Sequence, residues 1–375
     1  MDDTISPGAL HERIRAGEAL TVLDVRDKEA HDAWRIEAPS LRSVYHPYLR
    51  FLAAEANDEV DELVADLGLG GPVVVVCARG ETSGHAATLL REAGVDAANL
   101  AGGMEAWATR YVGRDIAVAG GTLRQYERPA TGCLAYLFAR DGEAIVVDPL
   151  RAFAARYVDD AAELGCDLVA ALDTHVHADH VSGVRAVAAR SDARTLLPDG
   201  ARERGLDFET DTLSDGDELA VGGATLSVSH APGHTSELLV VRVGDAVLSA
   251  DCLFLDGVGR PDLEAGDEGA PALARRLHDS LTALFSFPDD TLVAPGHGTL
   301  GTDPAPDGTL TRSLADVRER VTLGERDAFA ERILANAGER PANYERIIDV
   351  NLGRESVDEF EELELGPNNC AVSSA

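Results

Sequence analysis

One short stretch of this chain limits the folds that can accommodate it. The sequence DTHVHADHVSG (173–183) holds three histidines and two aspartates in eleven residues. Such a density of titratable side chains is costly in a core unless the side chains are paired. The apolar segment DLVAAL (167–172) predicts a strand that leads into it, and His175 and His177 can point to one cavity where the backbone turns. Histidine and carboxylate are ligands of zinc and ferrous iron, so the stretch predicts a metal site at a strand end.

Further residues extend this hypothesis. Asp179 and His180 complete the cluster, and we expect them at the start of the next helix. Three later residues are also candidate ligands: His234 in APGHTSE, Asp251 in LSADCLF and His297 in APGHGTL. Each follows a β-rich run, so all three can reach one site from loops at strand ends. The spacing H-x-H-x-D-H followed by these residues predicts a metal centre.

The first part of the chain alternates strands with helices. ALTVLDVR (19–26) is an apolar run that ends in charge, and GPVVVVCARG (71–80) is a β-branched run between glycines, typical of a buried parallel strand. Helical spacing follows over 82–94 and ends at a glycine, and 96–107 predicts a strand, a Gly-Gly turn and a helix start. This order predicts an α/β domain.

The pattern changes after residue 113. CLAYLFARDGEAIVVDP (133–149) predicts two strands joined by an Asp-Gly hairpin turn, and similar strand pairs are predicted over 218–233 and 237–254. Antiparallel pairs with helices between them indicate a second, larger α+β domain. We therefore predict domains at 1–113 and 114–375, with Arg114 to Ala119 as a linker.

A cysteine stands where the first domain would bind an anion. Cys77 ends a buried strand, and the short loop ARGE separates it from a helix. Backbone N–H groups of such a loop and a helix N-terminus form an anion cradle, which lowers a thiol pKa and favours a thiolate or persulfide. Arg79 adds positive charge and is a candidate contact for substrate. The alternative is a strand-end cysteine that is buried as a small hydrophobic residue.

The charge balance excludes some partners. Asp and Glu number 66 against 33 Lys and Arg, which gives a formal net charge of -33, and Lys28 is the only lysine. This surface repels nucleic acid and anionic membranes, so neither is an expected partner. The acidic residues are spread along the chain, which is typical of a halophilic protein solvated in a very salty cytoplasm.

Membrane and secretory signals are not found. No run of about 18 apolar residues predicts a membrane-spanning helix, and MDDTISPGAL lacks the basic segment of a secretory signal. We therefore expect a cytoplasmic protein. The five cysteines have no paired spacing, and disulfides are rare in that compartment, so no disulfide framework is predicted.

Three segments of the first domain resemble the signatures of a rhodanese domain. They are LDVRDKEAHDAWRI, VVVVCARGETSGHAATLLREAG and NLAGGMEAW, and the resemblance covers about residues 6–110. It implies that Cys77 carries sulfane sulfur. Many rhodanese loops have an arginine before the serine where this chain has Thr82, so the resemblance leaves the preferred sulfur donor open.

The histidine cluster and its later partners resemble the metallo-β-lactamase superfamily over about residues 119–301. This resemblance implies an αββα sandwich with metal between the sheets. Two branches fit: zinc hydrolases of the glyoxalase II type and persulfide dioxygenases with one iron. The segment DCLFLDGVGRPDLEAG, with Arg260 and Asp262, the short chain after His297 and the ending ANYERIIDVNLG…LELGPNNCA are more similar to the dioxygenases.

The dioxygenase resemblance implies one ferrous ion per chain, bound by His175, His234 and Asp251. This set leaves positions open for water, substrate and oxygen. Four residues would orient ligands or substrate, and in a two-zinc site they would be ligands instead: His177, Asp179, His180 and His297. Arg260 would contact a substrate carboxylate or support the iron site, with a structural salt bridge as the alternative. Cys252 is expected on the opposite face of the strand from Asp251, away from the ion.

Together the resemblances imply one sulfur pathway. The first domain would move sulfane sulfur between a donor and a small thiol through a Cys77 persulfide, and the second would oxidise a low-molecular-weight persulfide with dioxygen to sulfite and thiol. Two alternatives stay open: a zinc thioester hydrolase fused to a sulfurtransferase, and a first domain that acts only as a persulfide sensor. The identity of the thiol and the oligomeric state, with a homodimer as one alternative, also stay open.

Overall fold

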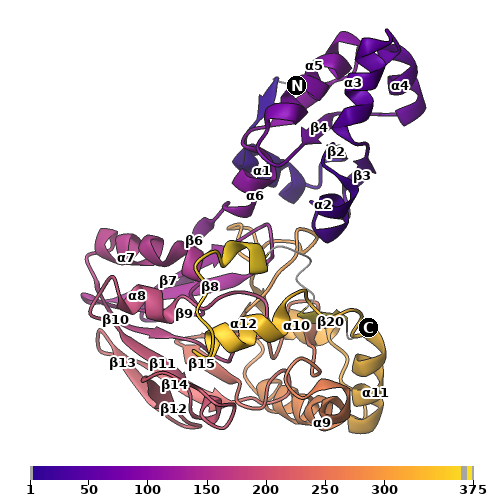
Figure 1. Ribbon diagram of the computed structural model, residues 1–375. Coiled ribbons are helices and arrows are strands. Elements are labelled where there is room, and N and C mark those ends of the chain that lie inside the picture. The colour runs from indigo at the N-terminus through magenta and orange to yellow at the C-terminus, as the bar shows by residue number, and fades with distance from the viewer. Residues whose placement is uncertain (1–2, 365–369, 374–375) are drawn as a thin grey trace.

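A parallel five-stranded sheet forms the centre of the first domain. The computed structural model describes residues 3–364 and 370–373, and the strand order in this sheet is β1-β5-β4-β2-β3 (Figure 1). The strands are β1 (Thr4–Ile5), β2 (Leu20–Asp24), β3 (Leu41–Tyr45), β4 (Val73–Val76) and β5 (Ala97–Leu100). The helices are α1 (Pro7–Arg15), α2 (Lys28–Ala33), α3 (Tyr48–Ala56), α4 (Val60–Leu67), α5 (Glu81–Glu92) and α6 (Gly103–Ala108).

Helices cover both faces of this sheet. Successive strand residues point to opposite faces, so an apolar run such as β4 contributes to two cores. Val74 packs in one core with Leu10 of α1 and Trp107 of α6, whereas Val75 packs in the other with Phe51 of α3. A strand that is apolar at every position is therefore buried on both sides, as the sequence predicts for an α/β domain.

Two facing sheets form the second domain. The seven-stranded sheet has the order β12-β11-β10-β9-β8-β7-β6. Its strands are β6 (Val112–Val118), β7 (Gly121–Glu127), β8 (Leu134–Arg140), β9 (Glu143–Val147), β10 (Asp167–Leu172), β11 (Arg194–Pro198) and β12 (Asp211–Leu213). The six-stranded sheet has the order β13-β14-β15-β16-β18-β19. Its strands are β13 (Glu218–Val221), β14 (Ala224–His230), β15 (Leu239–Val243), β16 (Ala246–Ala250), β18 (Leu292–Pro295) and β19 (Arg312–Ser313), and a separate pair joins β17 (Gly257–Gly259) to β20 (Ala371–Ser373).

Helices lie outside both sheets. They are α7 (Ala154–Glu163), α8 (Val184–Ala188), α9 (Gly266–Leu284), α10 (Leu314–Arg320), α11 (Arg326–Asn336) and α12 (Tyr344–Asn351), with short 3₁₀ helices η1 (Arg151–Phe153), η2 (Asp199–Ala201) and η3 (Glu361–Glu364). In β8, Phe138 faces the core shared with the other sheet, and its neighbour Leu137 packs with Tyr157 of α7. The predicted αββα arrangement is thus confirmed. No helix among the described residues combines the length and the apolar character that a bilayer crossing needs.

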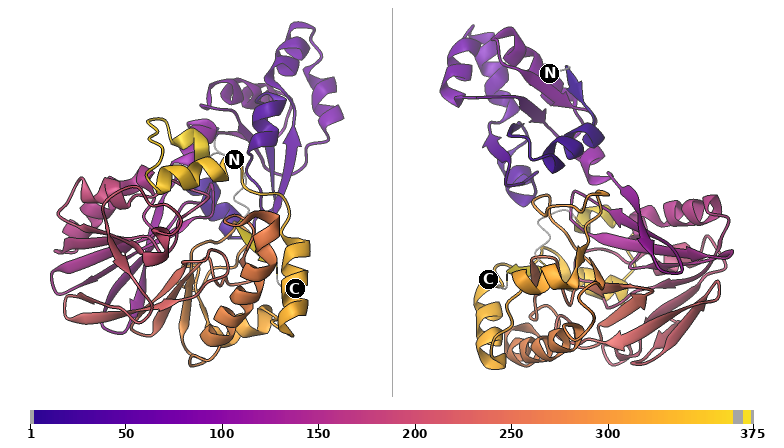
Figure 2. Two further views of the ribbon diagram at one scale, coloured as in Figure 1. Left: turned by 60° about the horizontal axis from the view of Figure 1, so that its bottom comes forward. Right: turned by 180° about the vertical axis from the view of Figure 1, so that it is seen from behind.

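The predicted linker is wrong. Residues 112–118 form β6, which pairs with β7 along its whole length at the edge of the seven-stranded sheet. Its inner residue Ile116 is buried, while the polar residues between are exposed or half-buried. An edge strand with so many polar residues looks like a linker in the sequence, because its backbone partner is decided only by the fold. The predicted boundary at 113 falls inside β6, and only residues 109–111 separate α6 from this strand. Figure 2 shows the N-terminal domain as a separate body beside the larger second domain.

The predicted hairpin turns are confirmed. Asp141 and Gly142 join β8 to β9, both with positive φ, and Gly222 and Gly223 join β13 to β14 in the same way. Positive φ at both central residues matches the right-handed twist of the paired strands, which explains why these positions carry Asp and Gly.

Candidate functional site

The histidine-rich loop between β10 and α8 is buried along its whole length. Its backbone is held from the end of the chain, because the side-chain amide of Asn351 donates to the carbonyl oxygens of His177 (3.0 Å) and His180 (2.8 Å). These two carbonyl oxygens therefore bond a side chain of a distant segment instead of N–H groups of a helix. The prediction that Asp179 and His180 begin the helix is therefore wrong, since α8 starts only after the loop.

Three side chains meet beyond the ends of three strands. His175 follows β10, His234 follows β14 and Asp251 follows β16. All three are buried, and one ligand atom of each lies within 4.8 Å of those of the other two. The distance from His234 Nε2 to Asp251 Oδ2 is 3.6 Å. The structure thus brings together the three residues that the sequence analysis assigns to the metal.

The free atoms of this group fit a cation. His234 Nδ1 donates to the carbonyl oxygen of Arg260 (2.7 Å), which leaves Nε2 for a ligand bond. His175 Nε2 and Asp251 Oδ2 are buried without a hydrogen-bond partner among the described residues. Each such atom costs about 1–3 kcal/mol, and a metal ion bound between them removes that cost. Two imidazoles and one carboxylate are also a donor set that suits ferrous iron or zinc.

Electrostatics favour the metal-binding form of these imidazoles. Burial, reinforced by the neighbouring His177 and His234, lowers the pKa of His175 well below its ordinary value. Burial also lowers the pKa of His234. Both imidazoles are therefore neutral at neutral pH, which is the state that coordinates a metal.

His177 is engaged by carboxylates. Its Nε2 lies 3.2 Å from Asp148 Oδ1 and 3.8 Å from Asp173 Oδ1. Burial and the neighbouring His180 would lower the pKa of His177, but the charge and hydrogen bond of Asp148 and the charge of Asp173 raise it above its ordinary value. Asp148 also accepts from the backbone N–H (2.7 Å) and hydroxyl (2.9 Å) of Thr174. The sequence analysis did not single out Asp148; its signal is an aspartate at the end of a β-branched run.

His297 bridges two carboxylates. Its Nδ1 donates to Asp251 Oδ1 and its Nε2 to Asp179 Oδ2, both at 2.8 Å. Burial would lower the pKa of His297, but the charges of the two aspartates raise it well above its ordinary value. A side chain at Gly296 would place a Cβ 2.4 Å from Asp251 Oδ1, so glycine is required for this approach. Both ring nitrogens of His297 are thus engaged by carboxylates.

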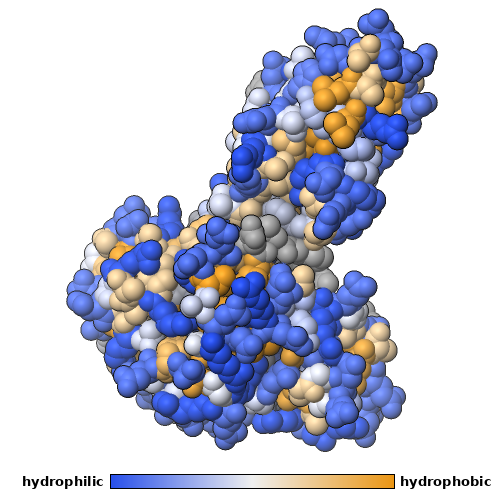
Figure 3. All heavy atoms as spheres, in the orientation of Figure 1, coloured by the Kyte–Doolittle hydropathy of each residue, from blue (hydrophilic) through white to orange (hydrophobic). Residues whose placement is uncertain are grey.

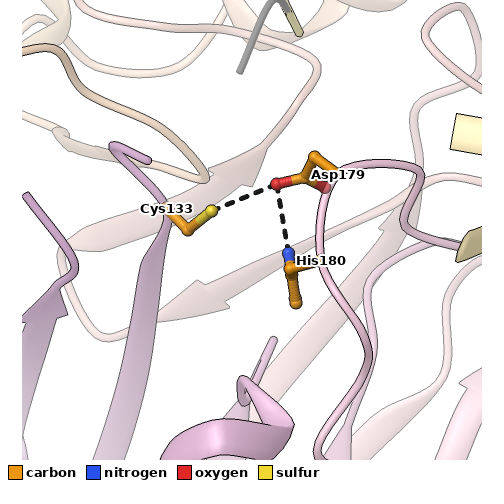
Figure 4. Close-up of side chains that lie close together, drawn as sticks. All are labelled: Cys133, Asp179 and His180. Carbon is orange, nitrogen blue, oxygen red and sulfur yellow. Dashed lines mark hydrogen bonds and ion pairs between the residues drawn. The ribbon is translucent and has the colours of Figure 1, made fainter. Parts of the chain in front are cut away.

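Two other side chains also contact the carboxylate of Asp179 (Figure 4). Cys133 Sγ donates to its Oδ2 at 3.1 Å, and His180 Nδ1 lies 3.1 Å from the same oxygen. Ligand atoms of these three residues lie within 4.8 Å of one another, and the same holds for Asp179, His297 and Cys370. The donors that a second ion needs are therefore also close together. Cys133 was not predicted, because its partner lies 46 residues away and no local pattern marks it.

The side chain of Arg260 lies in a salt bridge. It is fully buried, and its Nε and Nη2 donate to Asp262 Oδ1 (2.7 Å) and Oδ2 (3.0 Å). Its Nη1 donates to the carbonyl oxygen of Glu339 (2.7 Å). This is the structural alternative that the sequence analysis left open, and the backbone of Arg260 also orients His234. A contact to substrate stays a prediction.

Cys252 belongs to none of the ligand groups found among the described residues. Burial raises the pKa of its thiol to about 12, so it is not a thiolate at neutral pH. The sequence analysis placed Cys252 away from the ion because side chains alternate along a strand, and that reason is wrong. Asp251 and Cys252 both follow the end of β16 at Ala250, so the alternation of side chains along a strand does not apply to them.

The Cys77 loop is built to hold a negative charge. Cys77 Sγ accepts from the backbone N–H of Gly80 (3.1 Å) and from Ser83 Oγ (3.0 Å) at the start of α5. Burial would raise the pKa of Cys77, but hydrogen bonds from Ser83, Thr82 and the loop backbone outweigh burial and lower the pKa. Gly103 closes the loop from α6 with φ +60°, and a Cβ there would lie 2.3 Å from the carbonyl oxygen of Cys77.

Arg79 is exposed and forms an ion pair with Glu105, with 2.8 Å between Nε and Oε1. Its charge is therefore partly offset. The hydroxyl of Thr82, which stands where many rhodanese loops have arginine, contributes to the lowered pKa of Cys77. The predicted contact of Arg79 with substrate stays a prediction.

Two family models match the chain. The Rhodanese-like domain matches residues 6–110, and the Metallo-beta-lactamase superfamily matches residues 128–297. The first match contains Cys77, and the second contains the metal-binding group and ends at His297.

Two kinds of curated relative match about half of the chain. The mitochondrial persulfide dioxygenase ETHE1 of Homo sapiens is 30% identical over 200 residues, which covers 50% of this chain and 74% of the relative. The hydroxyacylglutathione hydrolase of Parasynechococcus marenigrum (strain WH8102) is 30% identical over 230 residues, which covers 56% and 88%. The hydroxyacylglutathione hydrolase of Xanthomonas campestris pv. campestris (strain B100) is 39% identical over 163 residues, which covers 43% and 58%. Identity alone does not separate the two activities.

A solved structure supports the fold. The metallo-beta-lactamase from Staphylococcus aureus subsp. aureus COL superposes with a TM-score of 0.56 at 24% identity, and the match covers 64% of this chain and 75% of that chain. The αββα sandwich, the buried histidine and aspartate group and the family matches agree. This chain belongs to the metallo-β-lactamase superfamily and carries a rhodanese-like domain ahead of its metallo-β-lactamase domain.

Proposed function

We propose that this protein is a persulfide dioxygenase with a sulfurtransferase domain. The second domain oxidises a low-molecular-weight persulfide at one ferrous ion. The reaction R–S–SH + O₂ + H₂O gives R–SH, sulfite and two protons, so the sulfane sulfur is oxidised, dioxygen is reduced and the thiol is released. The first domain exchanges sulfane sulfur with small thiols through Cys77.

The observation that carries the proposal is the pairing of His297. In a two-zinc site this imidazole binds an ion. Here both of its nitrogens bond carboxylates, Nδ1 that of Asp251 and Nε2 that of Asp179. His175, His234 and Asp251 remain as a group of two histidines and one carboxylate, which suits one ferrous ion with open positions.

The chain's own residues prepare this site. A ferrous ion held by the three ligands would supply adjacent open positions for the persulfide sulfur and dioxygen. The carbonyl oxygen of Arg260 fixes the ring of His234. His297 holds Asp251 through Oδ1, so Oδ2 stays directed at the ligand group, 3.6 Å from His234. The buried location of these groups excludes bulk water and strengthens their interactions.

Cys77 performs the sulfur transfer. Its thiolate attacks the outer sulfur of a donor, forms a new S–S bond and releases the donor as a thiolate or, from thiosulfate, as sulfite. A second thiolate then attacks the outer sulfur and regenerates Cys77. The N–H of Gly80 and the hydroxyl of Ser83 stabilise the anion in each state.

A zinc thioester hydrolase is the second candidate. Two observations favour it: hydroxyacylglutathione hydrolases match at 30–39% identity, and Asp179 brings further ligand atoms together beside the first group. The two candidate functions differ in the metal, in the number of ions per chain and in the reaction. Measurements on one preparation of the protein can therefore distinguish them.

The test uses anaerobically purified full-length protein, its metal content and two assays. We expect about one iron per chain, oxygen uptake that depends on added glutathione persulfide, sulfite as product and no hydrolysis of a glutathione thioester. His234→Ala abolishes iron binding and oxygen uptake. His230→Ala is the matched control, because His230 is an exposed histidine of the same region whose side chain bonds only a backbone oxygen, of Ser236, among the described residues.

Two zinc ions per chain with thioester hydrolysis and no persulfide-dependent oxygen uptake would establish the hydrolase. An iron content unchanged in His234→Ala would contradict the assigned ligands in either case.

A further inference from the structure

A cavity of about 810 Å³ lies between the two domains. Figure 3 shows the indentation of the surface where they meet. The second domain lines it with His297, Cys370 and Phe254, among others, and the ring of Phe254 lies edge-on to His297 at 5.9 Å. Because His297 donates to Asp251, the inner end of the cavity borders the metal-binding group.

The first domain supplies the opposite wall. The segment 32–39, at the end of α2 and beyond it, lines the cavity, and so does Trp107. Trp34 Nε1 donates to the carbonyl oxygen of Ala130 in the second domain (3.3 Å). Pro39 packs so closely on Gly301 that a Cβ there would lie 2.8 Å from its ring. Contacts between the domains therefore fix this wall in place.

One basic side chain from this wall stands out. Arg35 is the only arginine or lysine among the described residues that line the cavity. Its side chain is 35% exposed and, among the described residues, pairs only with Glu37, which is itself 58% exposed. Exposed pairs of this kind are weak, so an incoming carboxylate can compete for the guanidinium.

Four acidic residues are among the described residues of the lining. Three of them pair with a basic side chain, Asp32 with Lys28, Glu37 with Arg35 and Asp256 with Arg320, and the fourth is Glu339. Arg35 on the wall of the first domain and His297 on the wall of the second are the groups that we consider as substrate contacts. The size of the cavity is within the range of pockets for small molecules, about 300–1,000 Å³.

We propose that this cavity binds the substrate of the metal centre, and that Arg35 of the first domain recognises a carboxylate on the small thiol. The inference rests on the proposed function for the reaction and extends it. The persulfide sulfur enters past Phe254 and His297, while the carboxylate end reaches across to Arg35. The substrate class is an amino-acid or peptide thiol, and the first domain is part of the active site of the second.

Binding is measured apart from turnover. The chain has two tryptophans, Trp34 and Trp107, and both line the cavity, so their fluorescence reports its occupancy. The probes are S-methylglutathione, which has carboxylates and does not react, and S-methylcysteamine, which has none. Arg35→Ala should weaken S-methylglutathione binding about tenfold and leave S-methylcysteamine binding unchanged. Arg35→Lys should restore part of the affinity.

The matched control is Arg42→Ala. Arg42 is an exposed arginine of the first domain that bonds the carbonyl oxygen of Gly68 and does not line the cavity. We expect wild-type affinity for both probes in this variant. In oxygen uptake with glutathione persulfide, Arg35→Ala should raise KM about tenfold at unchanged kcat, because the contact is equal in the ground and transition states.

The outcomes separate the two proposals. Equal affinity of wild type and Arg35→Ala for S-methylglutathione, or no fluorescence change at saturation, would overturn the assignment of the cavity. Binding that depends on Arg35 in a protein without persulfide-dependent oxygen uptake would support the cavity and overturn the proposed reaction. Persulfide-dependent oxygen uptake with the same KM in wild type and Arg35→Ala would support the proposed reaction and overturn the assignment of the cavity.

Discussion

A buried carboxylate ties the two domains together, and its removal is a quantitative test of the fold. Glu127 lies at the end of β7 with its side chain only 4% exposed. Its Oε1 forms an ion pair with Arg15 of α1 and lies 3.3 Å from His11 Nε2, and its Oε2 lies 3.4 Å from Arg114. Arg15 also donates to two carbonyl oxygens of the second domain, at 2.9 and 2.8 Å.

The contribution of Glu127 to the stability of the folded state follows from the pKa of its carboxyl group. Burial would raise the pKa of Glu127, but the hydrogen bond from His11 and the charge of Arg15 lower it from 4.5 to about 2. A lowered carboxyl pKa stabilises the folded state at pH values above the unfolded pKa, here by about 3 kcal/mol at neutral pH. The contribution is lost as the pH falls from about 4.5 towards 2, and about 1 kcal/mol of it is gone at pH 3.5.

The contribution of Glu127 to the free energy of unfolding is measured by urea unfolding at constant molar salt, with tryptophan fluorescence as the signal. Glu127→Gln should lose about 3 kcal/mol at pH 7, because it keeps the shape and leaves the arginine charge without its partner. The loss should shrink to about 2 kcal/mol at pH 3.5. Glu62→Gln, an exposed glutamate of α4, is the control and should change little. A loss below about 1 kcal/mol at pH 7, or an equal loss at both pH values, would refute the reasoning.

Three other predictions concern charge, sulfur and metal. Dialysis from about 1 M to 0.1 M salt lengthens the screening distance from about 3 to 10 Å, so a chain of net charge -33 should lose near-UV circular dichroism and activity; unchanged spectra would contradict this. Cys77→Ser should abolish sulfur transfer from thiosulfate to a thiol, yet keep oxygen uptake with preformed persulfide, and background uptake in a folded variant would disprove the division between domains. Asp251→Asn should lose more bound iron than His177→Ala, since only the former removes a ligand charge; equal losses would count against the ligand set.

Local patterns predicted the strands and their turns well. An apolar run bounded by glycines specifies a buried strand, and Asp141 with Gly142 specifies a tight turn, because these preferences act over a few residues. His175, His234 and Asp251 each follow the end of a strand. Strand-end loops also explain why the candidate ligands lie close together, whereas the choice of these three among the candidates came from the family resemblance and stays a prediction.

Contacts between distant residues were not predictable from one sequence. Cys133 bonds Asp179, and Asn351 bonds the backbone of the histidine loop from more than 170 residues away. Neither residue has a local signature, since each works only through a partner that the fold supplies. Of the segment LELGPNNCA, residues 365–369 lie outside the described residues. The strand β6 was missed for a similar reason, because an edge strand depends on its neighbour β7 more than on its own composition.

The charge of the chain acts first on the junction between the domains. Each domain has its own apolar cores, whereas the junction combines polar contacts, such as those of Glu127 and of Trp34 with Ala130, with small apolar contacts such as Leu300 against the first domain. Hydrophilic residues cover most of the visible surface (Figure 3), and 66 acidic residues are spread along both domains. When salt is low, repulsion between the two acidic bodies reaches farther, while the cores are not weakened in the same way. Because the cavity at Arg35 needs both domains, separation at the junction would remove substrate binding before either sheet unfolds.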